Sequence, residues 1–240
     1  MHASASFIRY LLRMDSRWAR PWFALTAACV AAGLGIQLVL NARTESFFGG
    51  SALNRALNVF AFFTIQSNVL VGVACLLLAI RTQRRSSFFA VFRLTGLVSI
   101  TVTFLVFHTV LSKLLVLDTW PQVANQLQHT VVPVLAVLGW LMFGPRGLTS
   151  ARIVRWSAVF PLLYMVFTAI RGPLASDWYP YPFTDVHALG YLRVGINALW
   201  IALLFVGLAA GATFLDRKRK WKQEIDGQPA RREPAAAPKA

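Results

Sequence analysis

Long apolar runs are the feature that most constrains this chain. A helix needs about 20 apolar residues to cross roughly 30 Å of hydrocarbon, and 57% of the 240 residues are hydrophobic while 14% are charged. Backbone amides in lipid must be paired within their own segment, and no alternating strand pattern occurs, so the runs are expected to be helices. The sequence predicts an all-α, polytopic membrane protein, a bundle of six transmembrane helices at about 22–40, 57–80, 94–112, 126–143, 154–172 and 191–214.

The positions of arginine and lysine predict the orientation of this bundle. Nineteen of the 24 basic residues fall in the N-terminal arm, in the connections at 81–93 and 146–155, or in the tail after residue 214. By the positive-inside rule these segments, and therefore both termini, are cytoplasmic. The net charge of +15 is a topology signal on this interpretation, and no nucleic-acid partner is expected. Two regions follow: a membrane domain at 1–215 and a basic, disordered cytoplasmic tail at 216–240.

Polar side chains interrupt the second apolar run. Thr64 and Asn68 are four residues apart and share one helical face. Gln66 lies between them in the sequence. If this helix begins near Leu57 at the outer boundary, a rise of about 1.5 Å per residue places Thr64 roughly 10 Å deep. A hydroxyl in hydrocarbon is costly unless it is used, which makes Thr64 a candidate functional residue. The alternative is that these side chains form hydrogen bonds between helices, worth about 0.6 kcal/mol each.

Ionisable groups gather on the same, outer side of the predicted bundle. His129 stands at the head of the fourth run, about 5 Å below the outer boundary, and His108 is near the outer end of the third. For both histidines the alternative is a structural role, with the His129 imidazole hydrogen-bonded to a loop carbonyl near the headgroups. The other ionisable groups expected on this side are Asp118, Arg171, Asp177, Asp185, His187 and Arg193.

The connection between the fifth and sixth runs has an unusual composition. Two prolines hold residues 177–185 extended, and the aromatic side chains between them suit a membrane interface. The segment is predicted to lie as a lid across the outer mouth of the bundle. A simple aromatic-belt loop is the alternative.

Three motifs in this chain resemble those of a known family. They are Phe63-Thr64-Ile65-Gln66-Ser67-Asn68, Asn125-Gln126-Leu127-Gln128-His129-Thr130 and Tyr179-Pro180-Tyr181-Pro182-Phe183. Together with the six spans, over about residues 20–215, they resemble the bacterial predicted six-pass membrane proteins. That group in turn is similar to the eukaryotic androgen-induced and androgen-dependent TFPI-regulating proteins.

The resemblance implies an enzyme. The eukaryotic members are intramembrane threonine hydrolases that cleave fatty acid esters of hydroxy fatty acids, with a Thr nucleophile and a His partner. Carried over, Thr64 is the nucleophile and His129 the base of a lipid ester hydrolase that needs no cofactor and no metal. The expected partners are membrane lipids and the lipid ester. The expected location is a bacterial inner membrane, a source that the excess of Arg over Lys, 19 to 5, also favours.

Further residues are candidates for supporting parts in this chemistry. Asn68 or Gln66 would donate to the oxyanion, and Arg171 or Arg193 would hold a carboxylate of the lipid. His108 lies nearby on the outer side, and Asp118 or Asp185 would orient the imidazole of His129.

Three other functions are open from the sequence. The histidines with an aspartate could bind a transition metal or haem, although their spacing matches no ligand motif. A carrier would place polar groups through the full thickness of the membrane, whereas the inner halves of the spans are almost wholly apolar. A non-catalytic lipid-binding or structural membrane protein is the main alternative to the hydrolase.

Overall fold

All the regular elements in the described part of the chain are helices. The computed structural model describes residues 16–44, 50–114 and 116–226, and no strand occurs in these ranges. The predicted disordered tail lies mostly at 227–240, outside the described residues. The α-helices are α2 (Ala19–Arg43), α3 (Ala52–Leu57), α4 (Phe63–Ile80), α5 (Ser87–Val106), α6 (Thr119–Gln126), α7 (Val132–Met142), α8 (Ala151–Ser157), α9 (Val159–Leu174) and α10 (Val186–Asp226).

Short helical elements of other types join or interrupt these helices. Two of them, η3 and η5, are π-helical, and the others are 3₁₀ turns. They are η1 (Ser16–Trp18), η2 (Asn58–Ala61), η3 (Phe107–Leu111), η4 (Ser112–Leu114), η5 (Leu127–Val131) and η6 (Pro182–Thr184).

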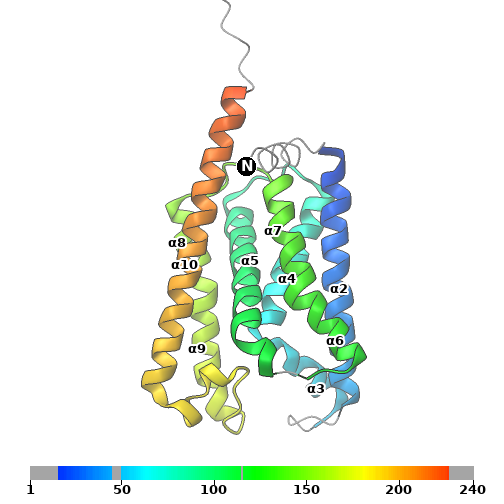
Figure 1. Ribbon diagram of the computed structural model, residues 1–240, viewed down its shortest axis with the longest axis vertical. Coiled ribbons are helices and arrows are strands. Elements are labelled where there is room, and N and C mark those ends of the chain that lie inside the picture. Colours follow the sequence, from blue (N-terminus) through cyan, green and yellow to red (C-terminus); the bar gives the residue numbers. More distant parts are fainter. Residues whose placement is uncertain (1–15, 45–49, 115, 227–240) are drawn as a thin grey trace, which may run out of the picture.

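The described residues form a multi-pass, membrane-type bundle. Five helices are long and apolar enough to cross a membrane, namely Ala19–Arg43, Phe63–Ile80, Ser87–Leu114, Ala151–Leu174 and Val186–Lys218. The expected span at 126–143 is not among them. There the chain runs along the bundle through α6, η5 and α7 in succession (Figure 1). The polar residues around His129 lower the mean hydropathy of this segment.

Several helix boundaries differ from those expected. The predicted span at 57–80 becomes α4, which begins only at Phe63, because α3 and η2 precede it as separate short helices. The predicted third span begins earlier than 94: the Ser86 hydroxyl accepts from the Phe89 N–H, which caps α5 from Ser87 on.

The early start of α5 moves one arginine out of the connection in which it was expected. Arg93 belongs to α5 and is only 8% exposed. Its guanidinium donates to the carbonyl of Pro145 at 3.0 Å, so the bundle meets part of the cost of burying this cation. Arg93 is therefore a structural contact between α5 and the loop after α7.

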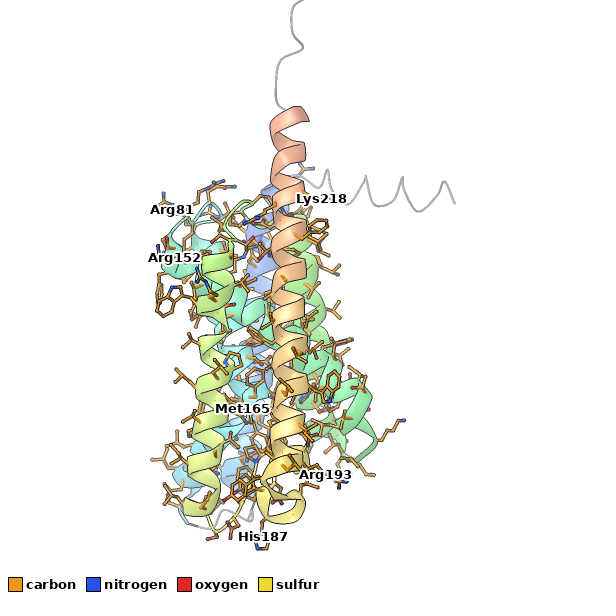
Figure 2. All side chains as sticks on the ribbon, turned by 90° about the vertical axis from the view of Figure 1, so that its left-hand side faces the viewer. Arg81, Arg152, Met165, His187, Arg193 and Lys218 are labelled. Atoms are coloured by element: carbon orange, nitrogen blue, oxygen red, sulfur yellow. The ribbon has the colours of Figure 1, made fainter. Side chains whose placement is uncertain are left out.

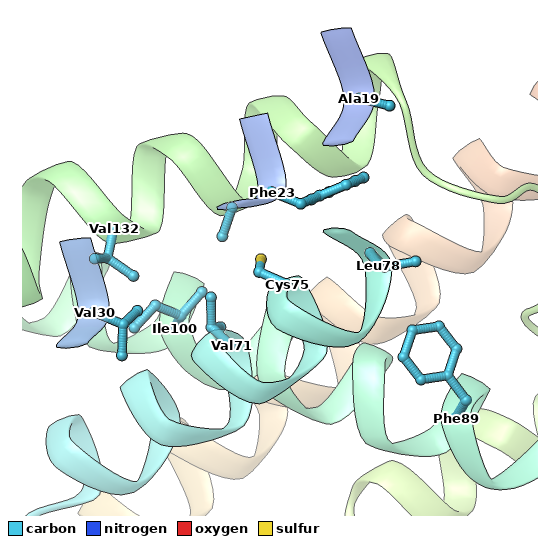
Figure 3. Close-up of a cluster of buried hydrophobic side chains, with 10 residues drawn as sticks. Ala19, Phe23, Val30, Val71, Cys75, Leu78, Phe89, Ile100 and Val132 are labelled. Carbon is cyan, nitrogen blue, oxygen red and sulfur yellow. The ribbon is translucent and has the colours of Figure 1, made fainter. Parts of the chain in front are cut away.

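The apolar core lies mainly between α2, α4, α5 and α7. Figure 3 shows Val30 of α2, Val71 of α4, Ile100 of α5 and Val132 of α7 in one cluster. The helices α2 and α4 approach closely at Gly72, where an added Cβ would lie 2.8 Å from Val30 Cγ1. A second cluster, including Leu94, Val102 and Phe205, packs α10 and α8 against α5.

The two ends of the bundle carry different sets of ionisable side chains. Figure 2 shows Arg81, Arg152 and Lys218 at one end and His187 and Arg193 at the other. The helices α2 and α10 respectively begin and end at the first of these ends (Figure 1). There the Arg20 guanidinium donates to the carbonyls of Ala79 and Ile80, which closes the C-terminus of α4.

The last helix does not end where the tail was predicted to begin. α10 starts at Val186, breaks at Gly190, where φ is +75°, and then continues to Asp226. Asp216, assigned to the tail from the sequence, is 1% exposed. Its Oδ2 accepts from the N–H groups of Leu148 and Thr149 and from the Thr149 hydroxyl, at 2.9–3.2 Å. This carboxylate ties α10 to the loop between α7 and α8.

Replacing Asp216 by Ala should destabilise the bundle. The substitution leaves two partly buried N–H groups without an acceptor, at a cost of about 1–3 kcal/mol. We expect a lower melting temperature in detergent, with Arg217→Ala, an exposed neighbour, as the control. Equal melting of the two variants would contradict a clamp at Asp216.

Candidate functional site

Thr64 lies in the first turn of α4, at the end of the bundle opposite the basic end. Phe62 is the N-cap, with extended backbone and no side-chain hydrogen bond to the helix. The first N–H groups of a helix have no partner within it. Here the Thr64 N–H donates to the hydroxyl of Tyr181, at 3.1 Å. Both the amide and the side chain of Thr64 are buried, only 6% of the residue being accessible.

The Thr64 hydroxyl meets the imidazole of His129. Thr64 Oγ1 and His129 Nε2 are 3.3 Å apart, although the residues are 65 apart in sequence. On the other side of the ring, Nδ1 is 3.1 Å from the carbonyl oxygen of Asn125. A carbonyl only accepts, so Nδ1 carries the hydrogen, and Nε2 of a neutral ring then accepts from Thr64. This bonding assigns the tautomer that a general base requires.

Two π-helical turns hold the imidazole. Residues Phe107–Leu111 and Leu127–Val131 are both π-helical, a geometry frequent at functional sites, and each contains a histidine. The ring of Phe107 stacks on that of His129 with centroids 4.1 Å apart. His108 Nε2 is 3.2 Å from the hydroxyl of Thr130. His108 therefore joins the two turns and does not contact Thr64.

A buried polar network lies beneath Thr64. The Ser67 hydroxyl donates to the Thr64 carbonyl at 2.9 Å and contacts the hydroxyl of Thr103 on α5. Asn68, fully buried, directs Nδ2 to the carbonyls of Thr64 and Gln128, at 2.8 and 3.2 Å. The amide expected to donate to an oxyanion is thus engaged in holding α4 against η5.

Two other predicted residues bond to the segment of this chain that precedes α4. Gln66 Nε2 donates to the carbonyl of Phe60 at 2.8 Å, which fastens the turn before α4. Arg171 donates to Asn58 Oδ1 at 2.8 Å, and its guanidinium lies 4.9 Å from the centre of the Trp178 ring. Gln66 and Arg171 contact the elements around Thr64, and neither bonds to Thr64 or His129.

The remaining predicted residues lie elsewhere. Asp185 Oδ1 accepts from the Ala188 N–H and so caps α10. Asp118 and Arg193 are exposed, and the partner of His129 Nδ1 is the Asn125 carbonyl. Within the described ranges no group of three or more His, Cys, Asp or Glu side chains gathers as metal ligands.

Tyr181 is the residue that sequence reasoning did not single out. Besides receiving the Thr64 N–H, its hydroxyl lies 3.2 Å from Thr64 Oγ1, and the residue is 8% exposed. The sequence signal for this residue is its place in the predicted lid, as the one tyrosine flanked by two prolines. Burial raises the pKa of the Tyr181 phenol, so that it is a neutral hydrogen-bond donor at physiological pH.

The loop carrying Tyr181 packs onto the start of α4. The rings of Trp178 and Tyr181 meet the ring of Phe62 edge to face, with centroids 5.6 and 5.9 Å away. The ring of Tyr179 lies so close to Gly172 of α9 that an added Cβ would overlap it. The expected lid is thus a packed cover over Thr64.

Two cavities meet at Thr64 and Tyr181, which line both. The lateral cavity, of about 400 Å³, lies between α5, α9 and α10 and includes Phe63, Val102, Met165 and Leu199. The outer cavity, of about 470 Å³, lies beneath the loop and includes Gln37, Phe107, Asn125 and His129. A mostly apolar space and a more polar one therefore meet at Thr64 and Tyr181.

Comparison with known proteins gives no match: no protein-family model, no curated protein and no solved structure matches this chain.

Replacing Tyr181 by Phe should destabilise the fold and change its response to alkali. The Thr64 N–H loses its acceptor, at a cost of about 1–3 kcal/mol. The raised pKa of the Tyr181 phenol means that the folded protein holds this proton more tightly than the unfolded chain. The contribution is complete below about pH 10, where the phenol of the unfolded chain ionises, and is lost above it.

The measurement is the melting temperature of wild type and Tyr181→Phe in detergent at several pH values. We expect a constant difference between about pH 7 and 9 and a smaller one above about pH 10. Tyr191→Phe, at an exposed position, is the control. A difference that grows with alkali would contradict the assignment.

Proposed function

We propose that this protein is an intramembrane hydrolase of lipid esters, with Thr64 as the nucleophile and His129 as the general base. The observation that carries the proposal is the 3.3 Å contact between Thr64 Oγ1 and His129 Nε2, with Nδ1 held by the Asn125 carbonyl. A nucleophile, its base and a group that orients the base is the arrangement expected for covalent acyl transfer.

The first half of the reaction forms an acyl-enzyme. His129 Nε2 takes the hydroxyl proton as Thr64 Oγ1 attacks the ester carbonyl, and the tetrahedral intermediate then loses the alcohol as its C–O bond breaks. The proton on His129 passes to the leaving oxygen. In the second half, His129 takes a proton from water, the resulting hydroxide attacks the acyl-threonine, and Thr64 recovers its proton as the acid leaves.

Tyr181 is the best candidate for stabilising the oxyanion. Its oxygen already accepts from the Thr64 N–H, and because Thr64 Oγ1 donates to His129, the Tyr181 hydroxyl hydrogen is the one directed at Thr64 Oγ1. It lies 3.2 Å from Thr64 Oγ1, the atom that attacks the carbonyl. The start of α4 adds a positive helix dipole at the same place. A neutral phenol directed at developing negative charge suits this step.

The membrane arrangement belongs to the same proposal. The chain has six spans, counting α6, η5 and α7 as one, with both ends of the described chain in the cytoplasm of a bacterium and Thr64 in the outer leaflet of the inner membrane. The segregation of Arg81, Arg152 and Lys218 from His187 and Arg193 supports this orientation (Figure 2). The substrate would then reach Thr64 from the lipid and water from the periplasm.

A non-catalytic lipid-binding protein is the second candidate. Most side chains around the lateral cavity are apolar, so the cavity could hold a lipid chain without any reaction. In that case Thr64, His129 and Tyr181 would serve only as hydrogen bonds between α4, η5 and the loop.

Labelling by a fluorophosphonate probe separates these two functions. We expect wild type to be labelled, Thr64→Ala to lose the label and Thr64→Ser to keep it, because Ser retains the hydroxyl. Removal of the base in His129→Ala should slow labelling by about 10²–10⁴-fold. The readout is probe incorporation into purified protein, with the modified peptide located by mass spectrometry.

Matched controls are Thr101→Ala, whose hydroxyl bonds within α5, and His187→Ala, which is exposed. Both should label as wild type does, and melting temperatures exclude misfolding. If wild type and Thr64→Ala are labelled equally, or if no variant is labelled, the hydrolase is contradicted and the non-catalytic lipid-binding protein is favoured.

Orientation can be tested with single introduced cysteines in intact spheroplasts. His187→Cys should react with a membrane-impermeant maleimide, because this residue would face the periplasm. Arg81→Cys should react only after lysis, since the positive-inside rule puts it in the cytoplasm. Wild type, with Cys29 and Cys75, gives the background. The reverse pattern would overturn the proposed topology.

A further inference from the structure

The lateral cavity opens sideways between α9 and α10. Leu162 of α9 and Leu199 and Val206 of α10 line it, and these side chains are 59%, 59% and 47% exposed. Exposed apolar side chains on membrane-spanning helices face hydrocarbon. Figure 2 views this side of the molecule, with Met165 on α9 beside α10. A chain in the surrounding lipid can therefore reach the cavity without crossing water.

The polar groups of the lateral cavity are concentrated near Thr64. Its polar side chains are Thr64, Thr103, Tyr164, Tyr181 and Thr184, and three of these already bond within the protein: Thr103 to Ser67, Tyr164 to the Ala61 carbonyl and Thr184 to the Tyr181 carbonyl. The rest of the wall is apolar. Such a surface fits a hydrocarbon chain and offers a polar headgroup no partner away from Thr64.

His129 lines the outer cavity and does not line the lateral one. The base that takes the Thr64 proton must return it to the leaving oxygen, so the alcohol must lie on the side of His129. The acyl part of the ester then points away from His129. The space available on that side of Thr64 is the lateral cavity.

From these three observations we infer that the lateral cavity is the binding site for the acyl chain of the ester, which enters from the lipid between α9 and α10. The alcohol part occupies the outer cavity, beneath the loop that carries Tyr181. This assignment rests on the proposed hydrolase, and it names the part of the substrate that each cavity takes.

Filling the lateral cavity should select against long acyl chains. Ala202 of α10 lines the cavity, whereas Ala210 of the same helix is exposed and does not. The probes are two fluorophosphonates, one with an ethyl and one with a hexadecyl group on phosphorus. The alkyl group stands in for the acyl chain, and fluoride for the leaving alcohol.

We expect Ala202→Phe to lower the ratio of hexadecyl to ethyl labelling rates about tenfold, because the added ring takes the space of several methylenes. Ala210→Phe should leave the ratio unchanged. A ratio unaffected by Ala202→Phe would overturn the acyl site, and would also show that any chain found in the cavity is a resting bilayer lipid.

A second measurement does not depend on catalysis. A photoactivatable palmitic acid, with a diazirine in mid-chain, should cross-link to the peptides that contain Met165 and Leu199, and Ala202→Phe should reduce this at least fivefold while Ala210→Phe does not. Cross-links spread evenly over the lipid-facing helices in every variant would overturn the acyl site. If wild type takes neither phosphonate yet gives the expected cross-links, the hydrolase fails, and the lateral cavity remains a binding site for a hydrocarbon chain that is not cleaved.

Discussion

The unpaired amides at the start of α4 are the constraint on which the end of the molecule that carries Thr64 depends. A helix that begins inside an apolar bundle brings N–H groups with no partner of their own. Here the Thr64 N–H is satisfied by the hydroxyl of Tyr181, from a loop that follows α9. That bond fixes the loop over Thr64 and leaves the threonine side chain directed at His129. The same interaction thus closes the helix and assembles the site.

Several of the buried polar side chains near Thr64 bond to one another and to backbone carbonyls. Ser67, Asn68 and Gln128 form a chain of hydrogen bonds from α5 through α4 and η5 to the Gly33 carbonyl of α2. In a low-dielectric interior such bonds are strong and their loss is costly, so the network sets the relative positions of these helices. The orientation of Thr64 and His129 is a consequence of that positioning, since both belong to elements that the network joins.

Five of the six predicted spans correspond to helices long and apolar enough to cross a membrane, and their ends were predicted less well. Apolar runs identify spans, but the beginning of a helix depends on local capping, as the start of α5 after Ser86 shows. Arg93 and Asp216 were placed outside the bundle because charge favours water, yet both are buried against partners supplied by distant loops. The role of Tyr181 was not predicted because it bonds to Thr64, which is 117 residues away in sequence.

Sequence alone determined that the chain is helical, apolar over several membrane-length segments and strongly basic at one end. These properties follow from composition, from the positions of the basic residues and from the need to pair every amide in lipid. None of them depends on how the helices pack. Motif resemblance selected Thr64 and His129 as a pair. Only the tertiary structure decided their 3.3 Å contact, the hydrogen on His129 Nδ1 and the meeting of two cavities at Thr64. These depend on where each helix starts and how it is rotated about its axis, which an almost uniformly apolar pattern does not specify.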